Sequence, residues 1–241
     1  MSNPVNTYTG VADGVCVAVV GATGQVGRVM RAMLAERDFP ARSVRFFSSA
    51  RSAGTVVDFR GAQVEVEDVA TADLAGIDVA IFSAGGAASR EHAPRFAAAG
   101  AVVVDNSSAW RKDPEVPLVV SEVNPHALRE RPKGIIANPN CTTIQMVVAL
   151  NAIERLSHIR RVHVATYQAA SGAGARGMAE LDDQIKAIAR GEEPEVKKFA
   201  YQLAYNLIPQ IDVFGDDDYT KEELKMYHET RKIMHSDVQV S

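Results

Sequence analysis

The apolar positions of the first half form continuous runs that alternate with segments of helical periodicity. The clearest run, Val15–Val20, is followed by valines, methionines and a leucine at helical spacing. Such a run is typical of a parallel strand buried on both faces. Further strands are predicted over residues 44–48, 79–86 and 101–108, with a helix over 87–99. This alternation indicates a doubly wound, Rossmann-like α/β sheet over residues 1–137.

The pattern changes in the second half. Residues 161–168 alternate between polar and apolar, which predicts a strand with one covered face that ends at Gln168. We therefore expect a second, α+β domain over residues 138–241. A helix is predicted whose apolar face carries Met178, Leu181, Ile185 and Ile188 and whose solvated side carries Glu180, Asp182, Asp183 and Lys186.

The composition argues against nucleic-acid-binding and membrane-spanning proteins. The 241 residues are 46% hydrophobic and 23% charged, with a formal net charge of −4 and no cluster of basic residues, which gives no support to nucleic-acid binding. No apolar run approaches the roughly 18 residues that a membrane span needs, and the N-terminus does not resemble a signal peptide. The two cysteines, Cys16 and Cys141, suit a reducing cytoplasm, and the histidines lack metal-ligand spacing. We expect small-molecule chemistry without a metal.

A G-x-x-G-x-x-G loop over residues 21–27 lies between the first strand and its helix. Such a loop brings backbone N–H groups to a pyrophosphate, although glycines at this spacing also suit a tight turn. An NAD site usually has an acidic residue after the next strand, but this chain has Ser48, Ser49, Arg51 and Ser52 there. Arginine and hydroxyls suit a 2′-phosphate and favour NADP; the alternative is a solvated loop arginine.

The sequence Asn-Pro-Asn-Cys-Thr-Thr at 138–143 separates an apolar strand from the apolar segment 144–156. Cys141 is therefore expected at a helix N-terminus, where unpaired N–H groups and the helix dipole favour a nucleophilic thiolate. The alternative is a small buried residue at a helix start. Arg111 follows another strand end and suits a phosphate or carboxylate, or else is a surface charge. Glu222 and Lys225 lie three apart in a helix predicted over 219–234, and on their own they indicate a surface ion pair.

Four motifs in order give the chain a resemblance to the aspartate-semialdehyde dehydrogenase family. They are Gly-Ala-Thr-Gly-Gln-Val-Gly at 21–27, the motif at 138–143, Thr-Tyr-Gln-Ala-Ala-Ser-Gly-Ala-Gly at 166–174, and Lys-Glu-Glu-Leu-Lys at 221–225. The resemblance implies a cytoplasmic enzyme of lysine (diaminopimelate), threonine and methionine biosynthesis. It would reduce L-aspartyl-4-phosphate with NADPH to the semialdehyde and phosphate. A homodimer or homotetramer is implied, with neither nucleic acid nor membrane as partner.

The resemblance also implies roles for individual residues. Cys141 would form an acyl thioester, Gln168 would orient the substrate, and Arg111 and Lys225 would hold phosphate. Glu222 would receive the substrate ammonium, and N–H groups beside Asn140 would stabilise the oxyanion. The residues implied for NADP are Gly21, Thr23, Gly24, Gln25, Val26, Gly27, Arg51, Ser52, Ser171 and Gly172.

The resemblance also implies that the second domain is incomplete at its C-terminal end, because the family's carboxylate-binding arginine and catalytic histidine belong to a segment that would follow residue 241. We therefore assign no histidine as the base, and we expect little turnover from these residues alone, since loss of a general acid–base typically costs about 10²–10⁴-fold. Two alternatives stay open: an enzyme resembling N-acetyl-glutamyl-phosphate reductase, and an inactive module for NADP binding or dimerisation.

Overall fold

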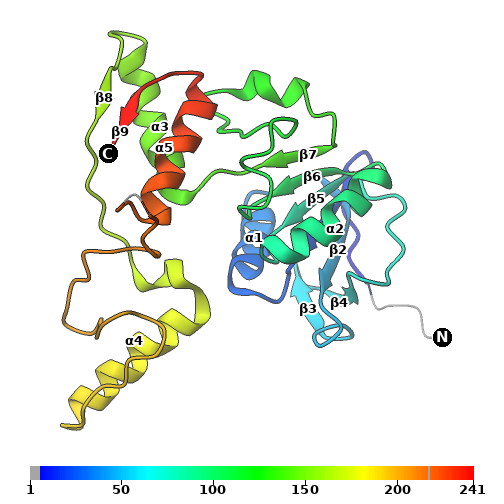
Figure 1. The fold of residues 1–241 in the computed structure, drawn as a ribbon. Coiled ribbons are helices and arrows are strands. Elements are labelled where there is room, and N and C mark those ends of the chain that lie inside the picture. Colours follow the sequence, from blue (N-terminus) through cyan, green and yellow to red (C-terminus); the bar gives the residue numbers. More distant parts are fainter. Residues whose placement is uncertain (1–5, 217) are drawn as a thin grey trace. The chain divides into compact units, whose positions relative to one another are not determined.

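The computed structural model describes residues 6–216 and 218–241 and divides into two compact units (Figure 1). The first unit runs to His158 and also includes Glu229–Ser236. The second unit consists of Ile159–His228 and Asp237–Ser241.

A seven-stranded sheet forms the centre of the first unit, in the order β3-β4-β2-β1-β5-β6-β7. All neighbouring strands are parallel except the antiparallel pair β3 and β4. The strand order reverses direction at β1, as expected for a doubly wound sheet, and ligands of such sheets bind at this reversal. The strands are β1 (Val15–Val20), β2 (Ala41–Ser48), β3 (Val56–Phe59), β4 (Ala62–Asp68), β5 (Val79–Phe82), β6 (Val102–Asp105) and β7 (Ile135–Ala137).

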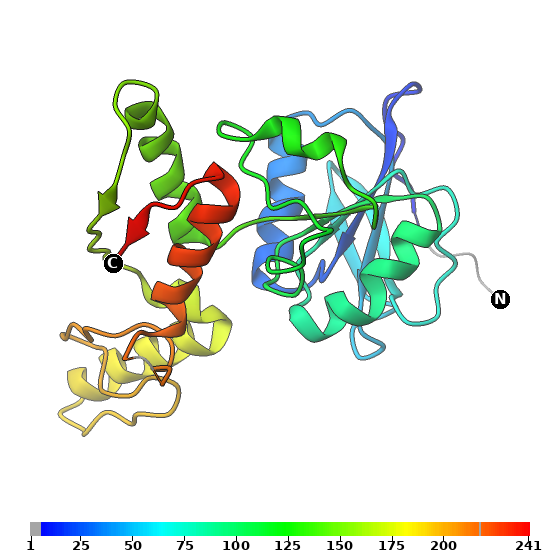
Figure 2. The same cartoon turned by 45° about the horizontal axis from the view of Figure 1, so that its top comes forward.

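Successive residues of β1 pack on opposite faces of the sheet. Val17 and Val19 belong to one apolar cluster together with Leu34 of α1 (Gln25–Glu36). Ala18 and Val20 belong to the other cluster, which contains buried residues of α2 (Gly86–Ala98). The two helices therefore cover opposite faces, as Figure 2 also shows. The predicted doubly wound α/β architecture is confirmed.

The hairpin of β3 and β4 was not among the predicted strands. Its two turn residues, Arg60 and Gly61, have φ values of +52° and +77°. Positive φ at both positions gives the two-residue turn that matches the twist of a hairpin. Arg60 also donates through Nη2 to the carbonyl of Leu34, 2.9 Å away at the end of α1. The hairpin thus extends the sheet at the edge opposite β7.

Helix α3 (Cys141–Glu154) belongs to the first unit, although the sequence analysis assigns its residues to a second domain. Val147 is fully buried in the same apolar cluster as Ile233, from the last turns of α5 (Lys221–Met234). The division by packing therefore falls after His158. The domain boundary at residue 137 stays a prediction.

The second unit contains much less strand than the sequence predicts. Only Arg161–Val162 (β8) of the strand expected over 161–168 is extended and paired, with the parallel strand β9 (Gln239–Val240). One further hydrogen bond joins the Val164 N–H to the Ser241 carbonyl at 2.9 Å. Residues 165–168 pair with no strand in the described part of the chain, so the predicted strand end at Gln168 is wrong.

The predicted orientation of helix α4 (Gly174–Ala189) is only partly confirmed. Asp182, Asp183 and Lys186 are exposed as expected, and Leu181 and Ile188 are half-buried. Met178 and Ile185, expected to be buried, are 43% and 42% exposed, whereas Glu180, expected in solvent, is buried. Glu180 accepts hydrogen bonds from the three successive backbone N–H groups of residues 197–199. Gln184 accepts from the N–H groups of Leu203 and Ala204 at 2.9 and 3.0 Å. The buried face is polar because it satisfies the backbone of an irregular segment, which an apolar face cannot do.

No helix in the described ranges is long and apolar enough to cross a membrane.

Candidate active site

The Cys141 corner joins β7 to α3. Asn140 is the N-cap residue, and its side-chain oxygen accepts from the N–H groups of Thr142 at 2.9 Å and Thr143 at 3.2 Å. Cys141 is the first residue of the helix, and its side chain is exposed. The cap satisfies N–H groups that a helix start otherwise leaves unpaired. The predicted strand-to-helix corner is confirmed, and the buried-cysteine alternative does not apply.

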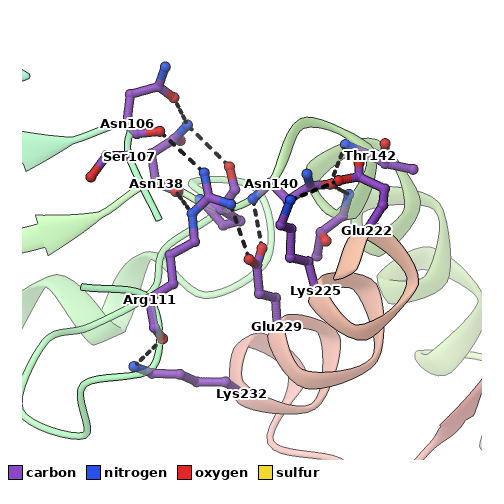
Figure 3. Close-up of polar contacts among 12 residues, drawn as sticks. Asn106, Ser107, Arg111, Asn138, Asn140, Thr142, Glu222, Lys225, Glu229 and Lys232 are labelled. Carbon is purple, nitrogen blue, oxygen red and sulfur yellow. Dashed lines mark hydrogen bonds and ion pairs between the residues drawn. The ribbon is translucent and has the colours of Figure 1, made fainter. Parts of the chain in front are cut away.

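Arg111 is buried against this corner, with 9% of its surface exposed. Its Nε donates to the carbonyl of Asn138 at 2.9 Å and its Nη2 to that of Asn106 at 3.2 Å (Figure 3). Its Nη1 donates to Glu229 Oε1 at 3.1 Å. A guanidinium has five N–H groups, so these bonds leave two for a ligand. Arg111 is therefore not the surface charge that its sequence context allowed.

Two residues of α5 that hold this region were not among the predicted site residues. Glu229 is 5% exposed, and its Oε2 accepts from the backbone N–H of Asn140 at 2.6 Å. Lys232 Nζ donates to three carbonyls of the Arg111 loop: Arg111 at 2.9 Å, Asp113 at 2.7 Å and Val116 at 2.8 Å. Burial lowers the pKa of Lys232, partly offset by Asp113 and Glu229. The end of α5 thus binds both the side chain and the backbone of Arg111.

The backbone N–H groups around the thiol are consequently not equivalent. Glu229 binds that of Asn140, and the cap binds those of Thr142 and Thr143. For the N–H of Cys141 itself, the described residues offer no acceptor. This N–H is therefore the one at the corner that is open to an oxyanion forming beside the sulfur.

The glycine loop lies at the carboxyl end of β1. Gly21 has a φ of +87°, and a Cβ there would lie 2.5 Å from the Ser83 carbonyl oxygen. A Cβ on Gly27 would lie 2.1 Å from the Gly21 oxygen, so the helix packs closely on the loop. Gly24 precedes α1 without a side-chain cap and is exposed, as are Gln25 and Val26. The loop therefore presents backbone at a helix start, which suits a dinucleotide pyrophosphate.

The residues predicted beside a 2′-phosphate follow β2. Thr23 Oγ1 lies 3.0 Å from Ser48 Oγ, which joins the glycine loop to the end of that strand. Arg51 is exposed and Ser52 is half-buried, in the turn after the strand. An exposed guanidinium and hydroxyls at the end of this strand fit the 2′-phosphate of NADP.

Three of the remaining predicted residues lie on irregular backbone of the second unit. Gln168 is exposed, and its Nε2 lies 3.4 Å from Thr166 Oγ1. Ser171 and Gly172 are in the short 3₁₀ helix η2 (Ala170–Ala173) and are exposed. A Cβ on Gly172 would have open space around it, so packing does not require glycine there.

Glu222 and Lys225 form the predicted pair in the first turns of α5. Lys225 Nζ lies 3.1 Å from Glu222 Oε2 and 2.9 Å from Asp212 Oδ2. Burial acts to lower the pKa of Lys225, but hydrogen bonds to Asp212 and Glu222 outweigh it, so the pKa is raised. Glu222 is only 7% exposed whereas Lys225 is half-buried, so the pair is partly buried rather than fully solvated. Across the described ranges, no three His, Cys, Asp or Glu side chains lie together as a metal site.

Family models match both parts of the chain. Residues 16–131 match a model described as the NAD binding domain of semialdehyde dehydrogenase. Residues 150–241 match a model described as the semialdehyde dehydrogenase dimerisation domain.

Relatives match at high identity. The chain is 54% identical to aspartate-semialdehyde dehydrogenase of Aquifex aeolicus, covering 92% of this chain and 66% of the relative. It is 51% identical to that of Streptomyces akiyoshiensis, covering 90% of this chain and 67% of the relative. It thus spans about two thirds of the length of these relatives.

Solved structures of aspartate semialdehyde dehydrogenases are also similar to this chain. The crystal structure of aspartate semialdehyde dehydrogenase II from Vibrio cholerae matches with a TM-score of 0.92 and 47% identity, covering 95% of this chain and 69% of that one. A structure of the same enzyme complexed with ASA also has a TM-score of 0.92, at 46% identity over the same shares. The chain therefore belongs to the aspartate-semialdehyde dehydrogenase family.

Proposed function

We propose that this chain is the nucleotide-binding and thiol-bearing part of an NADP-dependent aspartate-semialdehyde dehydrogenase that acts on L-aspartyl-4-phosphate in the cytoplasm. The observation that carries the proposal is the exposed Cys141 at the start of a capped helix. It follows β7, whose carboxyl end shares the sheet edge with the glycine loop after β1, because the intervening strands are parallel.

The reaction begins with the Cys141 thiolate. It attacks the acyl carbonyl of the substrate, a carbon–sulfur bond forms, and the acyl–phosphate bond breaks to release inorganic phosphate. The free N–H of Cys141 stabilises the negative charge that develops on the carbonyl oxygen. Arg111, with two uncommitted N–H groups, binds the phosphate. The product of this half-reaction is a thioester on Cys141.

NADPH, when bound, supplies the hydride that reduces such a thioester to the aldehyde with release of the thiolate. The glycine loop from Gly21 to Gly27 holds its pyrophosphate on the N-terminus of α1. Arg51 and Ser52 bind the 2′-phosphate. The exposed Val26, at 46%, offers apolar surface beside the loop.

The family motifs at 166–174 and 221–225 support the remaining roles. Glu222 receives the substrate ammonium, Lys225 assists with phosphate, and Gln168 orients the acyl group. Ser171 and Gly172 contact the nicotinamide cofactor. The match to a dimerisation domain supports an oligomer, and we propose a homodimer or a homotetramer.

The test isolates the first half-reaction, which needs no reducing cofactor. The chain is incubated with L-aspartyl-4-phosphate and its intact mass is measured before and after hydroxylamine. We expect one aspartyl group per chain, removed by hydroxylamine as a thioester is, and no adduct on the Cys141→Ala variant. N-acetyl-glutamyl phosphate serves as the competitor substrate. Preferential labelling by it would favour the alternative reductase, and absence of labelling by both would favour a non-catalytic module.

A further inference from the structure

Glu229 binds two parts of the Cys141 corner at the same time. One carboxylate oxygen lies 3.1 Å from Arg111 Nη1, and the other lies 2.6 Å from the backbone nitrogen of Asn140. The side chains of this ion pair are 10% and 6% exposed. All three residues belong to the first unit. The carboxylate thus joins the guanidinium to the residue that precedes the thiol (Figure 3).

Fold stability alone does not explain this choice of partners. The backbone of the Arg111 loop is already held by Lys232, which donates to three of its carbonyls. The start of α3 is already capped by the Asn140 side chain. A buried ion pair is often no more stabilising than apolar residues of similar volume. What Glu229 adds is a fixed guanidinium orientation and a negative charge that balances Arg111 close to Cys141.

We propose that Glu229 is a positioning residue for the reaction at Cys141. It orients Arg111 for the departing phosphate, holds the N–H of Asn140 so that the Cys141 N–H remains the open donor, and balances the guanidinium charge beside the sulfur. The inference rests on the proposed function, because these roles matter only if Cys141 is the nucleophile.

The charge balance is tested by alkylation with iodoacetamide at pH 6.5, with the modified cysteine identified by peptide mass. Buried Cys16 serves as the internal reference. E229Q removes a negative charge and leaves Arg111 unbalanced, which favours the thiolate, so we expect Cys141 to react about tenfold faster. R111Q leaves Glu229 unbalanced and should slow the reaction by a similar factor. The E229Q/R111Q double variant should react within about twofold of the wild type.

The positioning is tested by amide hydrogen exchange. Glutamine in E229Q has a single side-chain oxygen, which the Asn140 N–H and the Arg111 guanidinium would have to share. We expect amide exchange at Asn140 to rise about tenfold while exchange in strands β1 and β5 is unchanged. E229D keeps a carboxylate and should restore most of the protection. Glu36→Gln, on the exposed end of α1, is the matched surface control and should leave both measurements unchanged.

The outcomes separate this inference from the proposed function. Thioester formation together with unchanged alkylation in folded E229Q, R111Q and the double variant would overturn the positioning role and leave the function standing. Changes of the Cys141 alkylation rate in the same direction in E229Q and R111Q would also overturn the positioning role. Opposite changes of the Cys141 alkylation rate in E229Q and R111Q, without thioester formation, would support the local charge balance and reject the proposed dehydrogenase reaction. If E229Q does not fold, R111Q, E229D and the double variant decide the same question.

Discussion

Glu229 in the first unit and Glu180 in the second are both buried carboxylates that accept hydrogen bonds from backbone N–H groups. They differ in what else they bind. Glu229 pairs with the Arg111 guanidinium and binds the backbone N–H of Asn140, the residue that precedes the exposed Cys141. Glu180 binds three successive N–H groups of an irregular segment. Burial of a carboxylate therefore does not by itself indicate chemistry, because the partner determines whether the charge orders a chain segment or adjusts a reactive group.

The electrostatics of Glu180 follow from these partners. Burial acts to raise its pKa, but the N–H groups of residues 197–199 and the nearby Lys197 lower it below the ordinary value of 4.5. The segment thus acts on the carboxylate much as a small anion site acts on its ligand. Glu180 therefore has a structural role, and loss of its hydrogen bonds to residues 197–199 should affect the structure only locally.

The largest expected effect comes from breaking the Glu229 contact without compensation. Glu229→Ala leaves the Arg111 guanidinium buried and unpaired, which typically costs about 3–5 kcal/mol in the free energy of unfolding. Urea unfolding followed by the fluorescence of Trp110 measures this, since the single tryptophan belongs to the first unit and donates to Ser89 at 2.9 Å.

A paired apolar replacement is the control for this prediction. E229L together with R111M buries no charge, so it should recover most of the stability that Glu229→Ala loses. A loss below about 1 kcal/mol in Glu229→Ala would mean that solvent reaches the pair and that it behaves as a surface ion pair.

The matching change in the second unit should cost less. Glu180→Gln keeps the shape but replaces a charged acceptor with a neutral one, and we expect a local loss of about 1–3 kcal/mol in the attachment of residues 195–204. Amide exchange at residues 197–199 reports it. Asp183→Asn, on the exposed side of α4, is the matched control. Uniformly faster exchange across the first unit would show that Glu180 supports more than its own segment.

The sequence predicted the first unit well because its signals are local. Strands buried on both faces appear as continuous apolar runs, and the loop and corner between Gly21 and Cys141 follow such runs directly. The hairpin of β3 and β4 was missed, although residues 62–68 alternate and Arg60-Gly61 is a suitable turn. The alternation and the turn together are a sequence signal for this hairpin.

The second unit was predicted less well because its outcome depends on partners that the pattern does not specify. Alternation over 161–168 describes a strand only where a neighbour pairs with it, and here pairing ends near Val164. The apolar face of α4 was inferred from periodicity alone, whereas burial follows the backbone groups that Glu180 and Gln184 satisfy.

The missed residues of α5 do have a sequence signal. Glu222, Lys225, Glu229 and Lys232 are spaced three, four and three apart, which places them on one face of a single helix. The spacing of the first two predicts a surface ion pair, and the family resemblance implies their roles. Continuing the same spacing by two turns would have identified Glu229 and Lys232 as candidates, but not their partners, since Arg111 lies 118 residues earlier in the chain.

A smaller effect separates the side-chain cap of Asn140 from its backbone hydrogen bond to Glu229. Asn140→Ala removes the side-chain cap of α3 but keeps the backbone N–H that Glu229 binds, so we expect a loss of about 1 kcal/mol. Urea unfolding of the first unit measures it, and Asn140→Ser, another good cap, should recover most of the loss. A cost as large as that of Glu229→Ala would mean that the cap, rather than the carboxylate, holds the corner in place.

The smallest effect is the pH dependence of the Glu180 contact. A carboxyl whose pKa is lowered by folding contributes stability above its unfolded pKa and loses that contribution as the pH falls through the folded value. The pKa of Glu180 lies below 4.5, so the stability difference between wild type and Glu180→Gln should be constant near pH 6.5 and shrink by pH 3.5. Amide exchange at residues 197–199, corrected for the intrinsic effect of pH, follows it in both proteins. A stability difference that grew in acid would mean that the protonated carboxyl binds the N–H groups of residues 197–199 better than the carboxylate does. The role of Glu180 would then depend on the shape of its side chain rather than on its charge, unlike that of Glu229.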